Sequence, residues 1–258
     1  MPAAGPGNAP VEAVVLDIEG TTGSLSHVRD VLFPYARERL DSWAVAHRGS
    51  LPWQRVLDAV RAHIGAGEVT ERDVLALLHQ WADADAKAPP LKTVQGLIWA
   101  EGYASGELHG HVYAEVPRAL EGWKARGMAR YIYSSGSEAA QRDWFGHTAY
   151  GDLRDLLDGY FDLTSAGPKT SADSYRAISG AVRLPASRLL FVSDVGEELD
   201  AAAEAGWRTA AVRRPGDERG PVPGHEVIAS LDPLLSDNGL TEDASGSPAQ
   251  AQEEQRHA

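Results

Sequence analysis

The sequence predicts an α/β fold in which a Rossmann-like parallel sheet carries an inserted domain of α-helices. From residue 113 onward, short apolar stretches typical of strands alternate with helical stretches, as in a parallel sheet covered by helices. One isolated apolar strand precedes them near residue 14, and the apolar residues of 24–112 recur at helical spacing. Polar and acidic residues follow several strands, which is expected where a site forms at the carboxyl ends of a parallel sheet.

The composition excludes several classes of function. The chain has 258 residues, of which 43% are hydrophobic and 24% charged, and its formal net charge is -13. This charge argues against nucleic acid or an anionic membrane as a partner. The absence of cysteine excludes disulfides, thiolate metal sites and cysteine nucleophiles, and it fits a reducing cytoplasm. We expect neither a signal peptide in residues 1–10 nor a membrane span.

The same patterns divide the chain into segments. We expect a disordered N-terminus at 1–11, a sheet domain formed by 12–23 and 113–235, a four-helix cap at 24–112 and a disordered acidic tail at 236–258.

Four helices are expected in the cap, at residues 28–47, 51–64, 71–81 and 91–103. Pro34 lies inside the first and predicts a kink or a restart there. Thr70 and Asp73 have the spacing of a capping box for the third. In the sheet domain we expect strands at 128–133, 160–163, 188–192, 207–212 and 226–229, and helices at 117–126, 138–144, 174–180 and 199–205.

Two acids follow the first strand. Asp17 and Glu19 are two residues apart, so their side chains point to the same side of the strand end. Such carboxylates repel each other unless they share a cation or a proton. Gly20 allows a sharp turn, and Thr21 and Thr22 offer hydroxyl and amide donors to an anion. Alone, this stretch is equally compatible with an ordinary polar turn.

Residues further along the chain favour a phosphate chemistry. Strands end in Ser134-Ser135-Gly136 and in Ser193-Asp194, and a loop carries Lys169. Mg²⁺ prefers carboxylate and phosphate oxygens, and Asp17 and Asp194 can provide the carboxylates. Asp17 could attack phosphorus, and Glu19 could hold a proton for the leaving oxygen.

Other candidate site residues have both a functional and a structural interpretation. Ser134 and Ser135 could cap the helix that starts at Glu138 as well as bind phosphate. Three acids follow Asp194 and could surround the metal: Glu197, Glu198 and Asp200. The preferred interpretation is that they form the acidic first turn of a helix, where the helix dipole favours negative charge. Three cap residues could reach the site: Trp99, Glu101 and Tyr103. We expect seven histidines to be structural or on the surface: 27, 47, 63, 79, 109, 111 and 147.

The motifs resemble those of the haloacid dehalogenase superfamily, and within it those of the enolase-phosphatase (acireductone synthase) family of methionine salvage. The motifs are DIEGTT from Asp17, LFPYA at 32–36, QGLIWAEGYASGEL at 95–108, YIYSSGS at 131–137, KTSADSY at 169–175 and LFVSDVGEELDAA at 190–202. The resemblance covers residues 13–214, including the cap. Most phosphatases of the superfamily have aspartate where this chain has Glu19.

The resemblance implies a bifunctional, magnesium-dependent reaction. Its substrate is 2,3-diketo-5-methylthiopentyl-1-phosphate, which is converted through its enol phosphate to the acireductone 1,2-dihydroxy-3-keto-5-methylthiopentene and phosphate. One Mg²⁺ per chain and a cytoplasmic monomer are implied as well. The base that removes the enolisation proton is not assigned; Glu19, a cap residue and water are the alternatives.

The resemblance also implies a role for each motif residue. Asp17 is nucleophile and metal ligand, and Glu19 is general acid and binds the metal through its backbone carbonyl. Ser134 and Ser135 hold phosphate. Lys169 neutralises its charge, and Asp194 is a metal ligand.

Two stretches depart from the family pattern. The chain has Arg214-Pro215-Gly216-Asp217 where the family often has Arg-Pro-Gly-Asn, and Glu115-Val116 where it often has Asp-Val. Neither change alters the expected chemistry. The alternatives to an enolase-phosphatase are a phosphomonoesterase for another small phosphate ester, a phosphomutase and a non-catalytic module that binds a phosphorylated ligand.

Overall fold

The computed structural model describes residues 10–65, 69–215 and 220–235. The segments 1–9 and 236–258, for which disorder is predicted, lie outside the described residues. The predicted disordered N-terminus included residue 11, but Val11 is buried in the hydrophobic core. The following residue is also fixed, because the amide of Glu12 donates to the carbonyl of Arg188 at 2.9 Å.

Six parallel strands form one sheet in the described part of the chain, in the order β3-β2-β1-β4-β5-β6. The strands are β1 (Ala13–Leu16), β2 (Ala129–Tyr133), β3 (Gly159–Phe161), β4 (Leu189–Ser193), β5 (Arg208–Val212) and β6 (Glu226–Ile228). The predicted α/β fold with a parallel sheet is confirmed. The strand that carries Asp17 is central, since β1 pairs with both β2 and β4.

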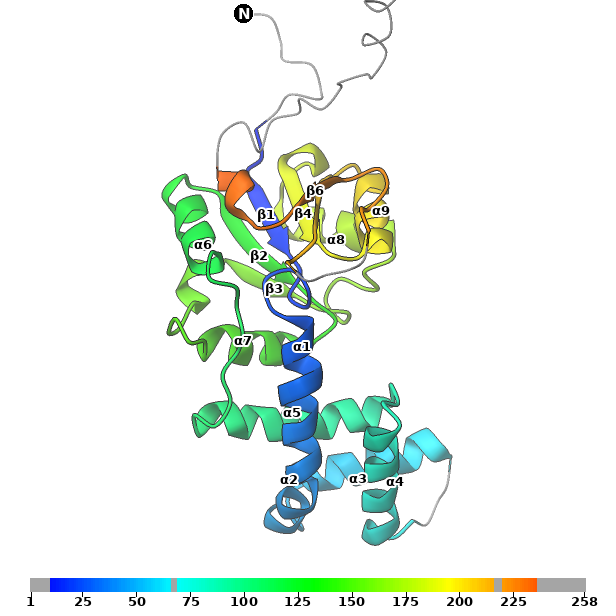
Figure 1. Ribbon diagram of the computed structural model, residues 1–258. Coiled ribbons are helices and arrows are strands. Elements are labelled where there is room, and N and C mark those ends of the chain that lie inside the picture. The colour runs from blue at the N-terminus through cyan, green and yellow to red at the C-terminus, as the bar shows by residue number, and fades with distance from the viewer. Residues whose placement is uncertain (1–9, 66–68, 216–219, 236–258) are drawn as a thin grey trace, which may run out of the picture.

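Helices cover both faces of the sheet (Figure 1). They are α6 (Val116–Ala125), α7 (Glu138–Gly146), α8 (Ala172–Val182) and α9 (Gly196–Glu204). Val14 and Leu16 pack with α6 and α7 on one face, and Ala13 and Val15 pack with α8 and α9 on the other. This alternation follows from the two-residue period of a strand whose faces are both buried.

The helix after β4 begins earlier than predicted. It was expected at 199–205, but α9 starts at Gly196. Acids in a first turn interact favourably with the helix dipole, so Glu197 and Glu198 suit this position. Three short 3₁₀ turns were not predicted: Arg154–Leu156, Ala186–Arg188 and Asp232–Leu235.

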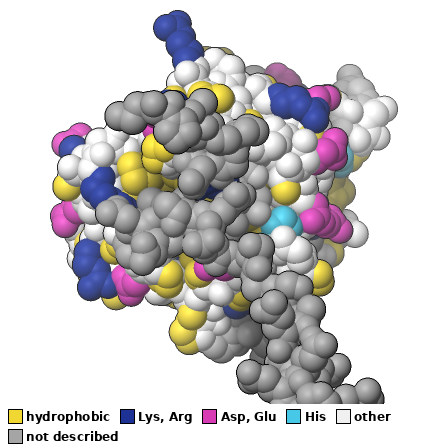
Figure 2. Space-filling view, turned by 90° about the horizontal axis from the view of Figure 1, so that it is seen from above, with side chains coloured by type: hydrophobic (Ala, Val, Ile, Leu, Met, Phe, Trp, Pro, Cys, Tyr) yellow, Lys and Arg dark blue, Asp and Glu magenta, His cyan; other side chains and the backbone are white. Residues whose placement is uncertain are grey.

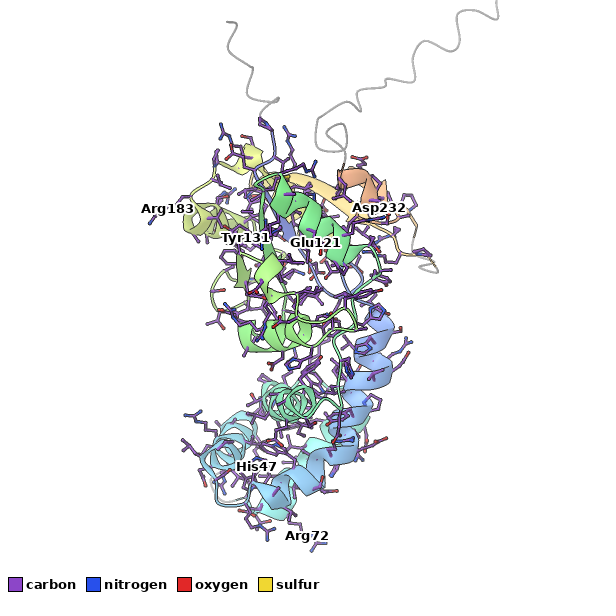
Figure 3. All side chains as sticks on the ribbon, turned by 90° about the vertical axis from the view of Figure 1, so that its left-hand side faces the viewer. His47, Arg72, Glu121, Tyr131, Arg183 and Asp232 are labelled. Carbon is purple, nitrogen blue, oxygen red and sulfur yellow. The ribbon has the colours of Figure 1, made fainter. Side chains whose placement is uncertain are left out.

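The segment between β1 and α6 forms a separate helical layer next to the carboxyl ends of the strands (Figure 1). It contains α1 (Leu25–His27), a π-helical turn (Val28–Leu32), α2 (Phe33–Ala46), α3 (Leu51–Ile64), α4 (Glu71–Asp83) and α5 (Pro89–Ala104). Helices α2 to α5 have their own apolar core, whereas Leu32 of the π turn packs in the core beside the sheet. Figure 3 shows the separation: His47 and Arg72 mark the helical layer, and Arg183 and Asp232 mark the opposite end.

Local sequence signals in this layer have the expected effects. The α-helix restarts at Phe33 after the π turn, which places Pro34 near its N-terminus, where the missing N–H is tolerated. Thr70 and Asp73 form the predicted capping box of α4. Ser50 caps α3 by accepting a hydrogen bond from the amide of Trp53.

The surface at the start of the strands carries acids and bases side by side. On the part of this face that Figure 2 leaves uncovered, Lys and Arg alternate with Asp and Glu, without a broad area of one sign. None of the helices in the described ranges is long and apolar enough to cross a membrane.

Candidate active site

A tight turn after β1 brings the two predicted acids to one cavity. Asp17 still belongs to the sheet, because its amide donates to the carbonyl of Val192 at 3.0 Å. The chain then reverses: the amides of Thr21 and Gly23 both donate to the carbonyl of Ile18, at 3.1 and 2.7 Å. Asp17 and Glu19 line the same cavity of about 160 Å³, as the strand geometry predicts.

The two threonines of this turn have a different role from the predicted one. Both side chains are buried, and neither lines the cavity. The hydroxyl of Thr22 donates to the carbonyl of Asp17 at 2.8 Å, and the amide of Thr21 is already bonded within the turn. The threonines therefore stabilise the turn and do not offer these donors to an anion.

Gly20 allows the turn to approach the second predicted metal ligand. Its φ is +76°, which favours glycine, and a Cβ there would lie 2.2 Å from Oδ2 of Asp194. Asp194 follows β4, the strand next to β1, and its side chain is buried. Its backbone carbonyl accepts a hydrogen bond from Arg213 at 2.5 Å. Any larger residue at position 20 would collide with Asp194.

Ser134 and Ser135, which follow β2, line the cavity and do not cap the helix. Ser137 is the N-cap of α7, since its side chain accepts from the amide of Ala140 at 3.3 Å. Ser134 is buried and Ser135 is exposed, and both line the cavity. The capping function suggested as an alternative thus belongs to a different serine.

Lys169 is held between two carboxylates. Its Nζ lies 2.6 Å from Oδ1 of Asp17 and 2.7 Å from Oε2 of Glu198, and its side chain is 7% exposed. Burial alone lowers the pKa of Lys169, but the two carboxylates outweigh this effect and the net pKa is raised. The loop itself is fixed by Tyr175, whose hydroxyl donates to the carbonyl of Lys169 at 2.8 Å.

Glu198 is a site residue that the sequence analysis assigned to an acidic helix turn. It lines the cavity, pairs with Lys169 and accepts a hydrogen bond from the hydroxyl of Ser193 at 2.9 Å. Burial first, and then the charge of Asp17, raise the pKa of Glu198 to about 7. Its place in the first turn of α9, directly after Asp194, is the signal that could have revealed it. Glu197 and Asp200 are exposed, in agreement with the preferred interpretation.

The predicted cap residues do not reach the cavity. Trp99 donates from its indole to the carbonyl of Leu32 at 2.7 Å, and Glu101 accepts from the indole of Trp43 at 2.9 Å. Tyr103 is buried in the apolar core beside the sheet. Of the described residues in 24–112, Leu25 lines the cavity, and it is 45% exposed. No apolar period marked Leu25 in the sequence.

The cavity is strongly acidic. The described residues that line it include four acids, Asp17, Glu19, Asp194 and Glu198, and one cation, Lys169. Burial, followed by repulsion from Asp17, raises the pKa of Glu19. Such an arrangement favours a bound cation or a carboxyl that keeps its proton. Within the described ranges, no three His, Asp or Glu side chains group closely enough to hold a metal by themselves.

Comparisons with known proteins agree with this fold and identify its family. A family model of haloacid dehalogenase-like hydrolases matches residues 11–206. Enolase-phosphatase E1 of Pseudomonas aeruginosa (strain LESB58) is 48% identical over 225 residues, which are 87% of this chain and 98% of the relative. Enolase-phosphatase E1 of Nocardia farcinica (strain IFM 10152) is 46% identical over 222 residues, 86% of this chain and 95% of the relative.

Solved structures show the same architecture. The crystal structure of the UTR4 protein from Saccharomyces cerevisiae has a TM-score of 0.71 and 33% identity, covering 85% of this chain and 98% of that chain. CbbY from Rhodobacter sphaeroides in complex with phosphate has a TM-score of 0.59 at 16% identity, which supports the fold alone.

The parallel sheet, the acidic cavity at its carboxyl end and the family match define a haloacid dehalogenase-like hydrolase. The matches to the relatives cover the helical layer as well as the sheet. Within this class the chain belongs to the enolase-phosphatase E1 family, as its motifs predict.

Proposed function

We propose that this protein converts 2,3-diketo-5-methylthiopentyl-1-phosphate through its enol phosphate to the acireductone 1,2-dihydroxy-3-keto-5-methylthiopentene and phosphate, in methionine salvage. The observation that carries the proposal is the shared cavity of Asp17, Glu19, Lys169 and Asp194 in a chain of the enolase-phosphatase E1 family. The two serines at positions 134 and 135 complete the set of groups that a phosphate ester needs.

The donor set fits one Mg²⁺ per chain. Asp17 and Asp194 are buried carboxylates directly after two neighbouring strands, and Mg²⁺ is commonly held by one or two carboxylates together with water and substrate phosphate. The excess of acids over Lys169 in the cavity supports a cation there. The backbone carbonyl of Glu19 is the third proposed ligand. When bound, the ion would supply positive charge for the phosphate and for the oxygens of the diketone.

The protein residues account for the phosphate transfer. Asp17 attacks phosphorus, and an aspartyl phosphate forms as the bond to the leaving oxygen breaks. The raised pKa of Glu19 suits a carboxyl that gives its proton to that oxygen. Water then attacks the aspartyl phosphate, and the Glu19 carboxylate accepts the proton of this water. Free Asp17 and inorganic phosphate are restored.

Lys169 and the serines position and neutralise the phosphate. An ammonium has three N–H donors, so the bonds of Lys169 to Asp17 and Glu198 leave one for a phosphate oxygen. Ser134 and Ser135 add donors from the neighbouring strand end. Charge neutralisation and alignment are the main requirements of phosphoryl transfer.

We also propose the division of the chain into a sheet domain (12–23 and 113–235) and a cap (24–112). The separate apolar core of α2 to α5 supports it. A cytoplasmic monomer without nucleic-acid or membrane partners completes the proposal, and the net charge of -13 supports the exclusion of anionic partners.

Incubation of the protein with the diketo phosphate ester tests this function. Enediol absorbance and phosphate release are followed together, with Mg²⁺ and with a chelator. We expect enediol formation and phosphate release that both depend on Mg²⁺. Phosphate release without enediol would indicate a phosphomonoesterase. Transfer of phosphate to a second sugar would indicate a phosphomutase, and binding without turnover a non-catalytic module.

A further inference from the structure

A buried arginine lies behind the turn that carries Glu19. Arg214 follows β5, and its side chain is 6% exposed. Its Nε donates to the carbonyl of Thr21 at 2.9 Å, and its Nη2 donates to the same carbonyl. The Nη1 forms an ion pair with Oε1 of Glu115, and the guanidinium lies 4.0 Å from the ring centre of Tyr113.

The three partners of Arg214 belong to two different segments. Thr21 lies in the turn 18–23, next to Glu19. Tyr113 and Glu115 lie in the linker 111–115, by which the chain returns from α5 to α6 and the sheet. The segments also touch directly, because the amide of Tyr113 donates to the carbonyl of Thr22 at 3.0 Å. Arg214 therefore joins the turn after the first acids to the linker from the helical layer.

The chemistry of arginine suits this junction. A guanidinium presents five donors in one plane, so it can bond a carbonyl and a carboxylate and stack on an aromatic ring at once. Glu115 is also largely buried, with 13% of its side chain exposed. Removing one member of a buried ion pair leaves the other charge buried without a partner, and this strongly destabilises the folded state. Glu115, which departs from the family pattern, is thus paired with Arg214, which follows it.

We propose that Arg214 is a positioning residue, which holds the turn 18–23 in place only while the linker 111–115 is seated against it. In this arrangement the placement of Glu19 depends on the linker of the helical layer. The role of Glu19 in this inference rests on the proposed function, whereas the link between turn and linker does not.

Arg130 provides a matched control at the other end of the sheet. It is equally buried, and it makes the same kinds of bonds: Nε to the carbonyl of Leu156 at 2.6 Å, and Nη1 to that of Met128 at 2.6 Å. Its Nη2 pairs with Asp158 at 2.8 Å. Arg130 lies near the start of β2, away from the cavity, so its loss reports the general cost of removing a buried arginine.

Hydrogen exchange of the substrate-free protein is the first measurement. The amides of Gly20, Thr21 and Gly23 are hydrogen-bonded within the turn, so they report its opening. In Arg214→Gln we expect their exchange to rise at least about tenfold together with that of 111–115, while Arg130→Gln leaves both segments as in the wild type. Unchanged exchange of the turn in Arg214→Gln would overturn the proposal, as would equal rises in both variants.

A second variant keeps the test valid if Arg214→Gln does not fold. Glu115→Gln removes the charge on the linker and leaves the bonds of Arg214 to Thr21 possible. We expect the turn 18–23 to exchange faster in this variant too, although no hydrogen bond of Glu115 reaches it. The control is Glu12→Gln, which removes a partner of Arg188 at the amino end of the sheet. Faster exchange of the linker alone would contradict the coupling.

Kinetics separate positioning from general stability. In Arg214→Gln we expect kcat to fall about tenfold or more, while KM stays within about threefold of the wild-type value. The reason is that Glu19 is misplaced, whereas the residues proposed to bind phosphate stay in position. Arg214→Lys keeps one donor for Thr21 and is expected to recover part of kcat. Equal kcat values for Arg214→Gln and Arg130→Gln would show a merely structural role. An inactive wild type with the expected exchange pattern would refute the proposed function and leave the coupling intact.

Discussion

The carboxyl end of the sheet and the core of the helical layer bury very different side chains. The sheet end buries Asp17, Lys169 and Asp194 around one cavity. The helical layer buries mainly aliphatic and tryptophan side chains, and Gln95 is the one buried polar side chain among the described residues of 24–112. Apolar burial stabilises a fold by roughly 25 cal/mol per Å², whereas buried charge costs free energy unless it is paired.

This difference assigns separate tasks to the two regions. Under the proposed function, the charges at the sheet end serve the chemistry, and the apolar core of α2 to α5 supplies stability. Substitutions at the sheet end should therefore abolish activity and leave the fold intact. Substitutions in the helical core should lower the free energy of unfolding and leave the activity of each folded molecule nearly unchanged.

The largest effect is expected for Asp17→Asn. The amide cannot attack phosphorus, so we expect kcat for phosphate release to fall by at least about 10³-fold. The fold should remain, because the substitution removes a charge from an acidic cavity and Glu198 still pairs with Lys169. Steady-state phosphate release and circular dichroism check both parts. Asp58→Asn on the exposed face of α3 is the control, and phosphatase activity retained in Asp17→Asn would refute the nucleophile assignment.

Leu78→Ala tests the other region. Leu78 is fully buried on α4, and its truncation leaves a cavity between helices. We expect the free energy of unfolding to fall by about 3 kcal/mol, measured by urea denaturation. Leu77 is the half-buried neighbouring residue, and Leu77→Ala should lower the free energy of unfolding by less. A tenfold loss of kcat in folded Leu78→Ala protein, without a change in stability, would mean that the two regions do not divide the tasks in this way.

Most of the fold could be predicted because its signals are local. Each predicted strand is present within a few residues, and the capping box at Thr70 sets the start of α4 as expected. The π turn at Val28–Leu32 and the early start of α9 were missed. Both lie close in sequence to residues that line the cavity, Leu25 and Val195, and tertiary contacts can override local propensity.

The candidate site was predicted in part, for a similar reason. Asp17, Glu19, Ser134, Ser135, Lys169 and Asp194 carry motif signals, and they share the cavity; their roles stay predictions. Glu198 was considered but assigned to an acidic helix turn, because acids are common in the first turn of a helix. Leu25 was not singled out, because no apolar period marks it. The contacts of Arg214 depend on the strand order, which places the end of β5 near the turn after β1.

A smaller effect is expected at the start of α3. The Ser50 side chain accepts from the amide of Trp53 at 3.3 Å, and alanine would leave this amide without its cap. We expect Ser50→Ala to lower the free energy of unfolding by about 1 kcal/mol, with kcat unchanged. Ser42→Ala is the control, since Ser42 is exposed within α2 and caps no helix. Equal losses in both variants would argue against a capping role for Ser50.

The smallest effect is expected where the two regions join. His27 lies at the start of the helical layer and His111 on its return linker, with ring centres 5.7 Å apart. Partial burial lowers the pKa of both histidines from 6.5. The unfolded chain therefore takes up these protons first as the pH falls, so stability decreases from about pH 6.5 down to the folded pKa values.

Urea denaturation at about pH 7.5 and about pH 5.5 measures this loss. In His27→Asn one of the two protonation steps is absent, so the difference in free energy of unfolding between the two pH values should be smaller than in the wild type. An unchanged difference would show that the junction does not contribute to the pH dependence. Because Arg214 also adds positive charge beside His111, the loss of stability at low pH should be smaller in Arg214→Gln as well.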